Sequence, residues 1–246
     1  MSASFAGAIF DVDGVLVDSP HEAAWCEALD ELMVGEWRGL VPGWRPGALT
    51  PDVYRRLVSG KPRLAGARAA LAELGVPDPD ARAPRYGERK QARLLELVEA
   101  GALHGYADAA RLVAALREAG VPTVAASSSA NAPLLLARVG LVLDADVSGR
   151  VDGPGKPHPG IFVAAARALG APPARCLVVE DAVAGVQAGR AAGMAVLGIA
   201  RADDAAQLAA AGAHLVVADL DDVDVAAVRA GRLARRDGLT ARAETG

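Results

Sequence analysis

The sequence predicts an α/β protein with a three-layer, parallel-sheet core and an inserted all-helical segment. Two observations lead to this fold class. From residue 103 onward, short β-rich runs alternate with single helical patterns, which is typical of right-handed βαβ units that cover both faces of a parallel sheet. Residues 19–102, in contrast, contain amphipathic helical patterns and no convincing strand. We therefore expect a core domain of residues 1–18 and 103–246, and a helical domain of residues 19–102.

Composition places the chain among globular proteins. It has 246 residues, of which 52% are hydrophobic and 23% charged, which is enough to bury a full core. The net charge of −4 gives no reason to expect a nucleic-acid partner, and no apolar run approaches the roughly 20 residues of a membrane span. Residues 1–10 lack a signal-peptide pattern, and Cys26 and Cys176 are expected to be free buried thiols. We therefore expect a cytoplasmic protein without membrane or nucleic-acid partners, and we expect a monomer.

The first strand is predicted at residues 6–10, a short apolar run that ends abruptly in polar residues. The helical insertion follows it. Within the insertion, residues 39–50 are rich in Trp, Pro and Gly and predict an irregular segment. The insertion's helices are predicted from their amphipathic patterns at 22–33, 52–58, 68–74 and 87–99.

The rest of the core is predicted from strands and helices in alternation. Helices 133–139, 159–169 and 182–192 are each followed directly by a glycine, the usual position of a helix-terminating residue. The second of these begins with a proline, which suits a first helical turn. Residues 229–246 lose their apolar periodicity and are expected to fray. The remaining strands are predicted at 121–126, 141–147, 176–179, 195–199 and 214–217.

The most informative motif is Asp11-Val12-Asp13-Gly14, directly after the first strand. Side chains alternate along an extended segment, so Asp11 and Asp13 lie on the same side of it. Two carboxylates this close raise each other's pKa unless a cation is bound between them. Gly14 then allows the chain to turn away from the strand. The motif predicts a divalent metal ion and a reaction that one or both carboxylates perform.

Further polar residues follow later strands or precede the helices between them. Ser127 and Ser128 come after the second core strand, and Glu180 and Asp181 come after the fourth. Lys156 precedes the helix that begins with proline, and it is one of only three lysines in the chain. In open parallel sheets, ligands bind beyond the carboxyl ends of the strands. Carboxylates there suit Mg²⁺, and the hydroxyl and ammonium groups suit an anion, for which phosphate fits best.

In this order and spacing, the motifs resemble those of the haloacid dehalogenase superfamily, in the branch that includes β-phosphoglucomutase and related sugar-phosphate phosphatases. The resemblance covers nearly the whole chain. It implies a Rossmann-like parallel-sheet core whose helical insertion is a mobile cap, with Mg²⁺ as cofactor and a phosphorylated small molecule as substrate. It rests on Asp11-Val12-Asp13-Gly14-Val15, Ser127, Lys156-Pro157 and Glu180-Asp181.

The resemblance also implies a role for each motif. Asp11 would accept the phosphoryl group as an aspartyl phosphate. Asp13 would protonate the leaving oxygen and then deprotonate the acceptor. Ser127 and Lys156 would hold the phosphoryl oxygens and neutralise developing charge. The Mg²⁺ ligands would be Asp11, the backbone carbonyl of Asp13, Glu180 and Asp181.

Five further residues are candidates for binding the substrate: Ser128, Asn131, His21, Lys61 and Arg63. His21 lies where the chain enters the insertion, and the alternative for it is a merely exposed position. Lys61 and Arg63 belong to a predicted basic loop, and the alternative interpretation is that this loop is only a solvated surface. Asn131 either binds the substrate or caps the helix that follows it.

A phosphatase acting on a sugar or polyol phosphate is the first expectation for the reaction. A β-phosphoglucomutase-type mutase is the alternative, but the arginine and lysine that grip its second phosphate would align near Gly60 and Ala130, where this chain has neither. A phosphonate hydrolase would need a Schiff-base lysine in the insertion, for which Lys61 and Lys90 are available. A dehalogenase would not need Asp13 or the second acidic pair. A non-catalytic protein that binds a phosphorylated metabolite is the remaining alternative.

Overall fold

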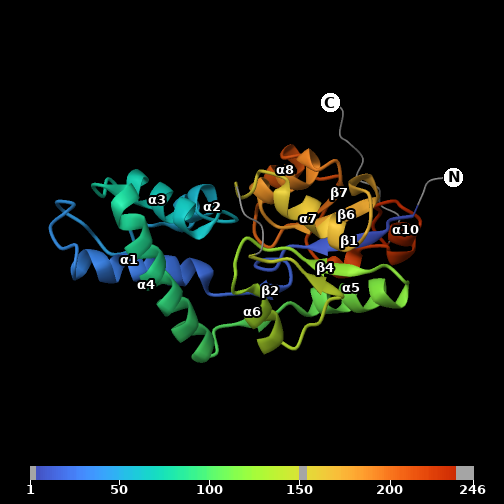
Figure 1. Ribbon diagram of the computed structural model, residues 1–246, viewed down its shortest axis with the longest axis horizontal. Helices are drawn as coiled ribbons and strands as arrows, with labels where there is room; N and C mark the ends of the chain where they lie inside the picture. Colours follow the sequence, from blue (N-terminus) through green and yellow to red (C-terminus); the bar gives the residue numbers. More distant parts are fainter. Residues whose placement is uncertain (1–3, 150–153, 237–246) are drawn as a thin grey trace. The chain divides into compact units, whose positions relative to one another are not determined.

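The computed structural model describes residues 4–149 and 154–236 (Figure 1). The chain divides into two compact units. Unit 1 comprises Met1–Asp18 and Gly105–Gly246, and unit 2 comprises Ser19–His104. The chain passes between the units at two short strands, β2 (Val17–Asp18) and β3 (His104–Gly105).

Unit 1 is built on a six-stranded sheet with the strand order β5-β4-β1-β6-β7-β8. Each neighbouring pair of strands is parallel, which confirms the predicted α/β class. β1 lies inside the sheet, where Ile9 pairs with Val124 of β4 on one side and with Val178 of β6 on the other. The strands are β1 (Gly7–Phe10), β4 (Thr123–Ala125), β5 (Ala145–Asp146), β6 (Cys176–Glu180), β7 (Ala195–Ile199) and β8 (Leu215–Val217).

Helices cover the sheet, with α7 and α8 on one side and α5 on the other (Figure 1). Ile9 belongs to a buried cluster with Phe162 of α7 and Val186 of α8. Side chains alternate along a strand, so the next residue, the fully buried Phe10, faces the opposite layer. The helices of unit 1 are α5 (Ala107–Glu118), α6 (Ala132–Arg138), α7 (Gly160–Ala168), η1 (Pro173–Arg175), α8 (Val183–Ala191), α9 (Ala205–Ala210), η2 (Leu220–Asp222) and α10 (Val225–Arg229).

Three of these helices, α5, α9 and α10, are not singled out by the sequence patterns. α9 and α10 have only 6 and 5 residues, too few for a helical period to be visible. In the stretch expected to fray, Ala234 accepts a hydrogen bond from the backbone N–H of Asp224, and Arg236 donates one to Asp222. Residues 237–246 of that stretch lie outside the described residues.

In the part that the structure describes, unit 2 is built from four α-helices, and its only strand residue is His104 of β3 at its boundary. Its core includes Trp25 and Tyr86, whose rings meet edge to face with centroids 4.9 Å apart. The Tyr86 hydroxyl donates to the backbone carbonyl of Trp25 at 2.8 Å, so its buried oxygen is satisfied. The third helix begins at Arg63, earlier than predicted, so Arg63 lies on a helix and not in a loop. The helices are α1 (His21–Val34), α2 (Pro51–Leu57), α3 (Arg63–Glu73) and α4 (Pro79–Glu99).

Two observations bear on the expectations drawn from composition. Cys26 of α1 is half-buried and Cys176 of β6 is buried, and both are free thiols. Across residues 4–149 and 154–236, no helix combines the length and the apolar character that a membrane span needs. The longest, α4, has 21 residues and carries charged side chains along its length.

Candidate active site

Three segments far apart in the sequence meet at the carboxyl edge of the sheet. Asp11 follows β1 directly, Glu180 is the last residue of β6, and Lys156 lies in the segment before α7. The Lys156 ammonium donates hydrogen bonds to Asp11 Oδ1 and to Glu180 Oε1. All three residues are buried, with exposed fractions of 4% for Lys156, 7% for Asp11 and 1% for Glu180. A buried ammonium therefore links two carboxylates at the point where parallel sheets bind ligands.

Lys156 remains a cation in this position. Burial by itself would lower the pKa of its ammonium, but the charges of Asp11 and Glu180 raise that pKa above its ordinary value. The ammonium also lies 5.0 Å from the centroid of the Phe162 ring, which adds a cation–π contact. The site thus contains a fixed positive charge that is shielded from water.

Negative charge nevertheless exceeds positive charge here. Burial raises the pKa of Asp11, and although Lys156 opposes the shift, Glu180 and Asp13 add to it. Burial also raises the pKa of Asp181 well above its ordinary value, and the charges of Glu180, Asp11 and Asp13 raise it further. Four carboxylates thus influence one another beside a single ammonium, an arrangement that a divalent cation would relieve.

The carboxylate oxygens of the site suit Mg²⁺, but Glu180 and Asp181, the second acidic pair, differ in how they are used. Glu180 is already engaged, because Oε1 accepts from Lys156 while Oε2 accepts from the backbone N–H groups of Asp181 and Ala182 at 2.9 and 3.0 Å. Among the described residues, no three Asp, Glu, His or Cys side chains form a ready-made metal cage. Mg²⁺ does not require one, since it commonly takes one or two protein carboxylates and completes its shell with water and substrate phosphate. Asp11 and Asp181 match that requirement.

The chain turns sharply after the first acidic pair. Gly14 has φ +84°, in the left-handed region that favours glycine. Its backbone N–H donates to the carbonyl of Val17, and the N–H of Val17 donates to the carbonyl of Val12. The Asp181 carboxylate packs against Gly14 so closely that a Cβ atom there would lie 1.9 Å from Asp181 Oδ2. The turn and the second acidic pair are therefore in direct contact.

Replacing Gly14 by Ala is expected to reduce turnover by about 100-fold, because the added methyl group displaces either Asp181 or the turn. The left-handed backbone alone costs an alanine about 1–2 kcal/mol of stability. Gly120→Ala is the matched control, since Gly120 has φ +75° and no atom within 4 Å of a built Cβ. Steady-state kinetics and chemical denaturation of both variants check this. Equal activity in the two variants would show that contact with Asp181 is unimportant.

Ser127 lies beyond the carboxyl end of β4 and is buried. Its backbone N–H donates to the hydroxyl of Ser148 at 2.9 Å, and its own hydroxyl accepts from the N–H of Ser129 at 3.1 Å. Ser148 is a residue that sequence reasoning missed, although its place just beyond β5 was an available signal. It is itself positioned by Asp146, whose carboxylate accepts from the Ser148 N–H at 2.7 Å. The segment that contains Ser127 is thus held in place by residues at the end of the neighbouring strand, β5.

The neighbouring candidates Ser128 and Asn131 lie in the same segment of unit 1. Ser128 is half-buried. Asn131 occupies the position before the first residue of α6, but its side chain makes no capping hydrogen bond to that helix. The capping alternative for Asn131 is therefore wrong.

One of the candidate residues of unit 2 is a buried histidine. His21 is 8% exposed, and its Nδ1 lies 3.1 Å from the ammonium of Lys90, which is 5% exposed. Burial, followed by the charges of Lys90 and Arg63, lowers the pKa of His21 well below its ordinary value, so the ring is neutral. His21 is therefore not an exposed residue. Lys61 is half-buried in the segment between α2 and α3.

Lys90 was named only as a Schiff-base candidate for the phosphonate-hydrolase alternative and was not among the predicted site residues. The rarity of lysine in this arginine-rich chain was a signal that could have identified Lys90. Two of the three lysines, Lys90 and Lys156, are buried beside titratable partners. The structure thus brings Asp11, Lys156 and Glu180 together in unit 1, and His21 and Lys90 together in unit 2.

Comparison with known proteins identifies the family of this chain. A family model described as haloacid dehalogenase-like hydrolase matches residues 5–193. The chain belongs to the haloacid dehalogenase-like hydrolase family. It is an enzyme of the phosphatase or phosphomutase type in the β-phosphoglucomutase-like branch, as the relatives described next indicate.

Two curated relatives of this hydrolase differ in their named activities. A β-phosphoglucomutase of Mycobacterium bovis is 36% identical over 238 residues, covering 87% of this chain and 90% of the relative. A fructose-1-phosphate phosphatase of Escherichia coli is 34% identical over 201 residues, covering 79% of this chain and 96% of the relative. Both types of phosphoryl transfer therefore occur among proteins similar to this one.

Solved structures agree with the family assignment. A hydrolase from Pseudomonas syringae has a TM-score of 0.71 and 27% identity, covering 87% of this chain and 94% of that chain. A haloacid dehalogenase family hydrolase from Deinococcus radiodurans, crystallised with phosphate and sodium, has a TM-score of 0.64 and 31% identity, covering 95% and 99%. The fold of this hydrolase is thus shared along nearly its whole length.

Proposed function

We propose that this hydrolase is a Mg²⁺-dependent phosphatase that acts on a small phosphorylated metabolite, a sugar or polyol phosphate, through an aspartyl phosphate on Asp11. The observation that carries the proposal is the buried Lys156 ammonium between Asp11 and Glu180 at the carboxyl edge of the sheet. An anionic nucleophile is repelled by a phosphoryl dianion. A fixed cation beside both offsets that repulsion where charge develops in the transition state.

The first step transfers the phosphoryl group to the enzyme. An oxygen of Asp11 attacks phosphorus, and the bond from phosphorus to the leaving oxygen breaks. Asp13 donates a proton to that leaving oxygen, while Lys156 and Ser127 hold the phosphoryl oxygens. In the second step Asp13 takes a proton from water, the water oxygen attacks phosphorus, and the bond to Asp11 breaks to release inorganic phosphate.

The metal site is proposed to use Asp11, Asp181 and the backbone carbonyl of Asp13. Mg²⁺ bound there supplies positive charge that lets the two anions, Asp11 and the phosphoryl group, approach each other. Glu180, which the family resemblance places among the metal ligands, is assigned to Lys156 instead. Its two oxygens already accept hydrogen bonds from Lys156 and from two backbone N–H groups.

The rest of the substrate is proposed to contact Ser128 and Asn131 in unit 1. Unit 2 is proposed to act as a cap that also contacts the substrate. His21 suits a hydroxyl-rich substrate, because an Nδ1 that accepts from Lys90 leaves the proton of the neutral ring on Nε2, as a donor. Lys61 and Arg63 add positive charge for a polar or anionic leaving group. Closure of such a cap would exclude bulk water from the reacting groups.

A phosphomutase is the second candidate, because the Mycobacterium bovis relative that carries this name is 36% identical. A mutase would share the first step. It differs in the second, where a hydroxyl of a sugar phosphate takes the place of water. The two functions therefore differ in the acceptor and not in the nucleophile.

The test is a set of phosphate esters assayed for two products at once. We expect fructose 1-phosphate and an aryl phosphate to release inorganic phosphate, with the release abolished by a chelator and restored by added Mg²⁺. Conversion of β-glucose 1-phosphate to its 6-phosphate, faster than phosphate release and dependent on a bisphosphate primer, would replace the phosphatase by the mutase. Turnover of no phosphate ester would overturn both.

A further inference from the structure

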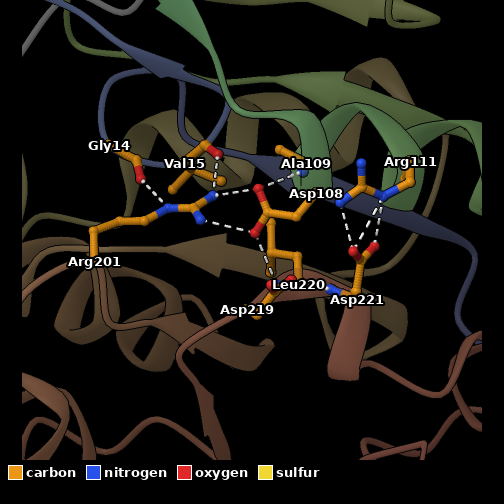
Figure 2. A network of polar contacts seen from close by, with 9 residues as sticks. All are labelled: Gly14, Val15, Asp108, Ala109, Arg111, Arg201, Asp219, Leu220 and Asp221. Carbon is orange, nitrogen blue, oxygen red and sulfur yellow. Dashed lines mark hydrogen bonds and ion pairs between the residues drawn. The ribbon is translucent and has the colours of Figure 1, made fainter.

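A half-buried arginine, Arg201, binds the turn that follows the first acidic pair. Arg201 lies just beyond β7 at the carboxyl edge of the sheet, and its guanidinium makes four hydrogen bonds (Figure 2). Nε donates to the carbonyl of Gly14 at 3.2 Å, and Nη2 donates to the carbonyl of Val15 at 3.1 Å. Its remaining two bonds go to the two carboxylate oxygens of Asp108, at 2.7 and 3.1 Å. One planar group therefore joins the turn to the start of α5.

Asp108 is the anchor of this network. It is 7% exposed, and its carboxylate accepts not only from Arg201 but also from the backbone N–H groups of Ala109 at 2.8 Å and Leu220 at 2.9 Å. Burial would raise the pKa of Asp108, but these donors lower it below its ordinary value, so the carboxylate is ionised. The guanidinium also stacks on Tyr106, 3.8 Å from the ring centroid. The guanidinium of Arg201 is thus held by Asp108 along its edge and by Tyr106 on one face.

Two backbone carbonyls of the turn accept hydrogen bonds from a side chain outside the turn. Its own backbone bonds use the carbonyls of Val12 and Val17, and in the described part of the chain the donor to the carbonyls of Gly14 and Val15 is Arg201. Asp13 directly precedes Gly14 in this turn, so a shift of the Gly14–Val15 backbone would move the Asp13 carboxylate with it.

We propose that Arg201 is a positioning residue for proton transfer by Asp13: its guanidinium, anchored on Asp108, fixes the Gly14–Val15 backbone and so aims the Asp13 carboxylate at the leaving oxygen. The inference rests on the proposed function for the role of Asp13, but not for the role of Arg201 in holding the turn. A lysine would not serve, because a single ammonium cannot match two carbonyls and both carboxylate oxygens as a planar guanidinium does.

The experiment compares two substrates that differ in their need for a proton. Phenyl phosphate has a poor leaving group that requires protonation, whereas 4-nitrophenyl phosphate has a good one that hardly does. We expect Arg201→Met to lower kcat/KM by about 100-fold on phenyl phosphate and by less than about 10-fold on 4-nitrophenyl phosphate. Arg201→Lys is expected to preserve stability better than Arg201→Met but to show the same difference between substrates. Equal losses on both substrates would overturn the proposal, because a merely structural defect does not distinguish leaving groups.

The matched control is the neighbouring pair in Figure 2. Arg111 lies on α5, the same helix as Asp108. It makes a bidentate contact with Asp221 but does not touch the turn. Arg111→Met removes a bidentate ion pair that is more exposed than that of Arg201, and it is expected to leave both rates unchanged. If Arg111→Met gave the same substrate difference as Arg201→Met, the effect would belong to α5 in general and the proposal would be wrong.

Amide hydrogen exchange supplies a readout that does not require activity. We expect Arg201→Met to speed exchange of the Gly14 and Val17 amide hydrogens, whose bonds close the turn, and Arg111→Met to leave it unchanged. Unchanged exchange in Arg201→Met would overturn the positioning role. A wild-type enzyme that hydrolyses neither ester would instead overturn the proposed function, while the exchange result still decides whether Arg201 holds the turn.

Discussion

Replacing Asp11 by Asn is expected to reduce phosphate release to less than about 1% of the wild-type rate, because the amide has no anionic oxygen to attack phosphorus. The substitution is nearly isosteric, and the amide oxygen can still accept the hydrogen bond that Lys156 donates to Asp11. The fold should therefore persist. Steady-state phosphate release, with circular dichroism and thermal unfolding as the folding check, measures both expectations.

Asp144→Asn is the control for the loss of one carboxylate. Asp144 lies before β5, where its carboxylate accepts from Thr123 at the opposite end of β4 from Ser127. Full activity is expected in this variant. Turnover above about 1% in a correctly folded Asp11→Asn variant would remove Asp11 from the nucleophile's role.

Replacing Lys156 by Met is expected to lower both stability and activity. It leaves Asp11 and Glu180 buried without their common cation. Removing one partner of a buried ion pair typically costs about 3–5 kcal/mol of stability. The loss of a donor to the phosphoryl oxygens lowers turnover by a further factor of about 100–1,000. Denaturant unfolding and phosphate release measure the two losses separately.

A double variant separates the two causes. In Lys156→Met with Glu180→Gln, the second buried charge is removed, and the amide can still accept from the backbone N–H groups of Asp181 and Ala182. Much of the lost stability should return, because the uncompensated charge is smaller, while the turnover should not. If activity returned together with stability, Lys156 would be a structural residue only.

The strands and the residues at their ends were predictable because both signals are local. An apolar run that stops at a carboxylate, as at Phe10 and Asp11 or at Val179 and Glu180, identifies a buried strand and its polar end in one short segment. The parallel topology then requires those ends to share one edge of the sheet. The meeting of Asp11 and Glu180 across neighbouring strands therefore follows from sequence pattern and topology together.

The residues that support the site were not predictable in the same way. Arg201 and Asp108 are 93 positions apart and occupy segments without a local motif, so only the folded chain shows that they pair. Ser148 and Lys90 likewise gain their meaning from a partner on another element. The start of α3 at Arg63 was not predictable either, because packing in unit 2 extends this helix beyond the periodic pattern of its sequence.

The most direct test of the account is the stereochemical course at phosphorus. A phosphorothioate substrate, made chiral at phosphorus with two oxygen isotopes, is hydrolysed in water that carries the third isotope, and the configuration of the released thiophosphate is determined. Each in-line displacement inverts phosphorus, so transfer to Asp11 followed by transfer to water gives overall retention. The account predicts retention. Inversion would mean that water attacks the substrate directly, and it would contradict the aspartyl phosphate on Asp11.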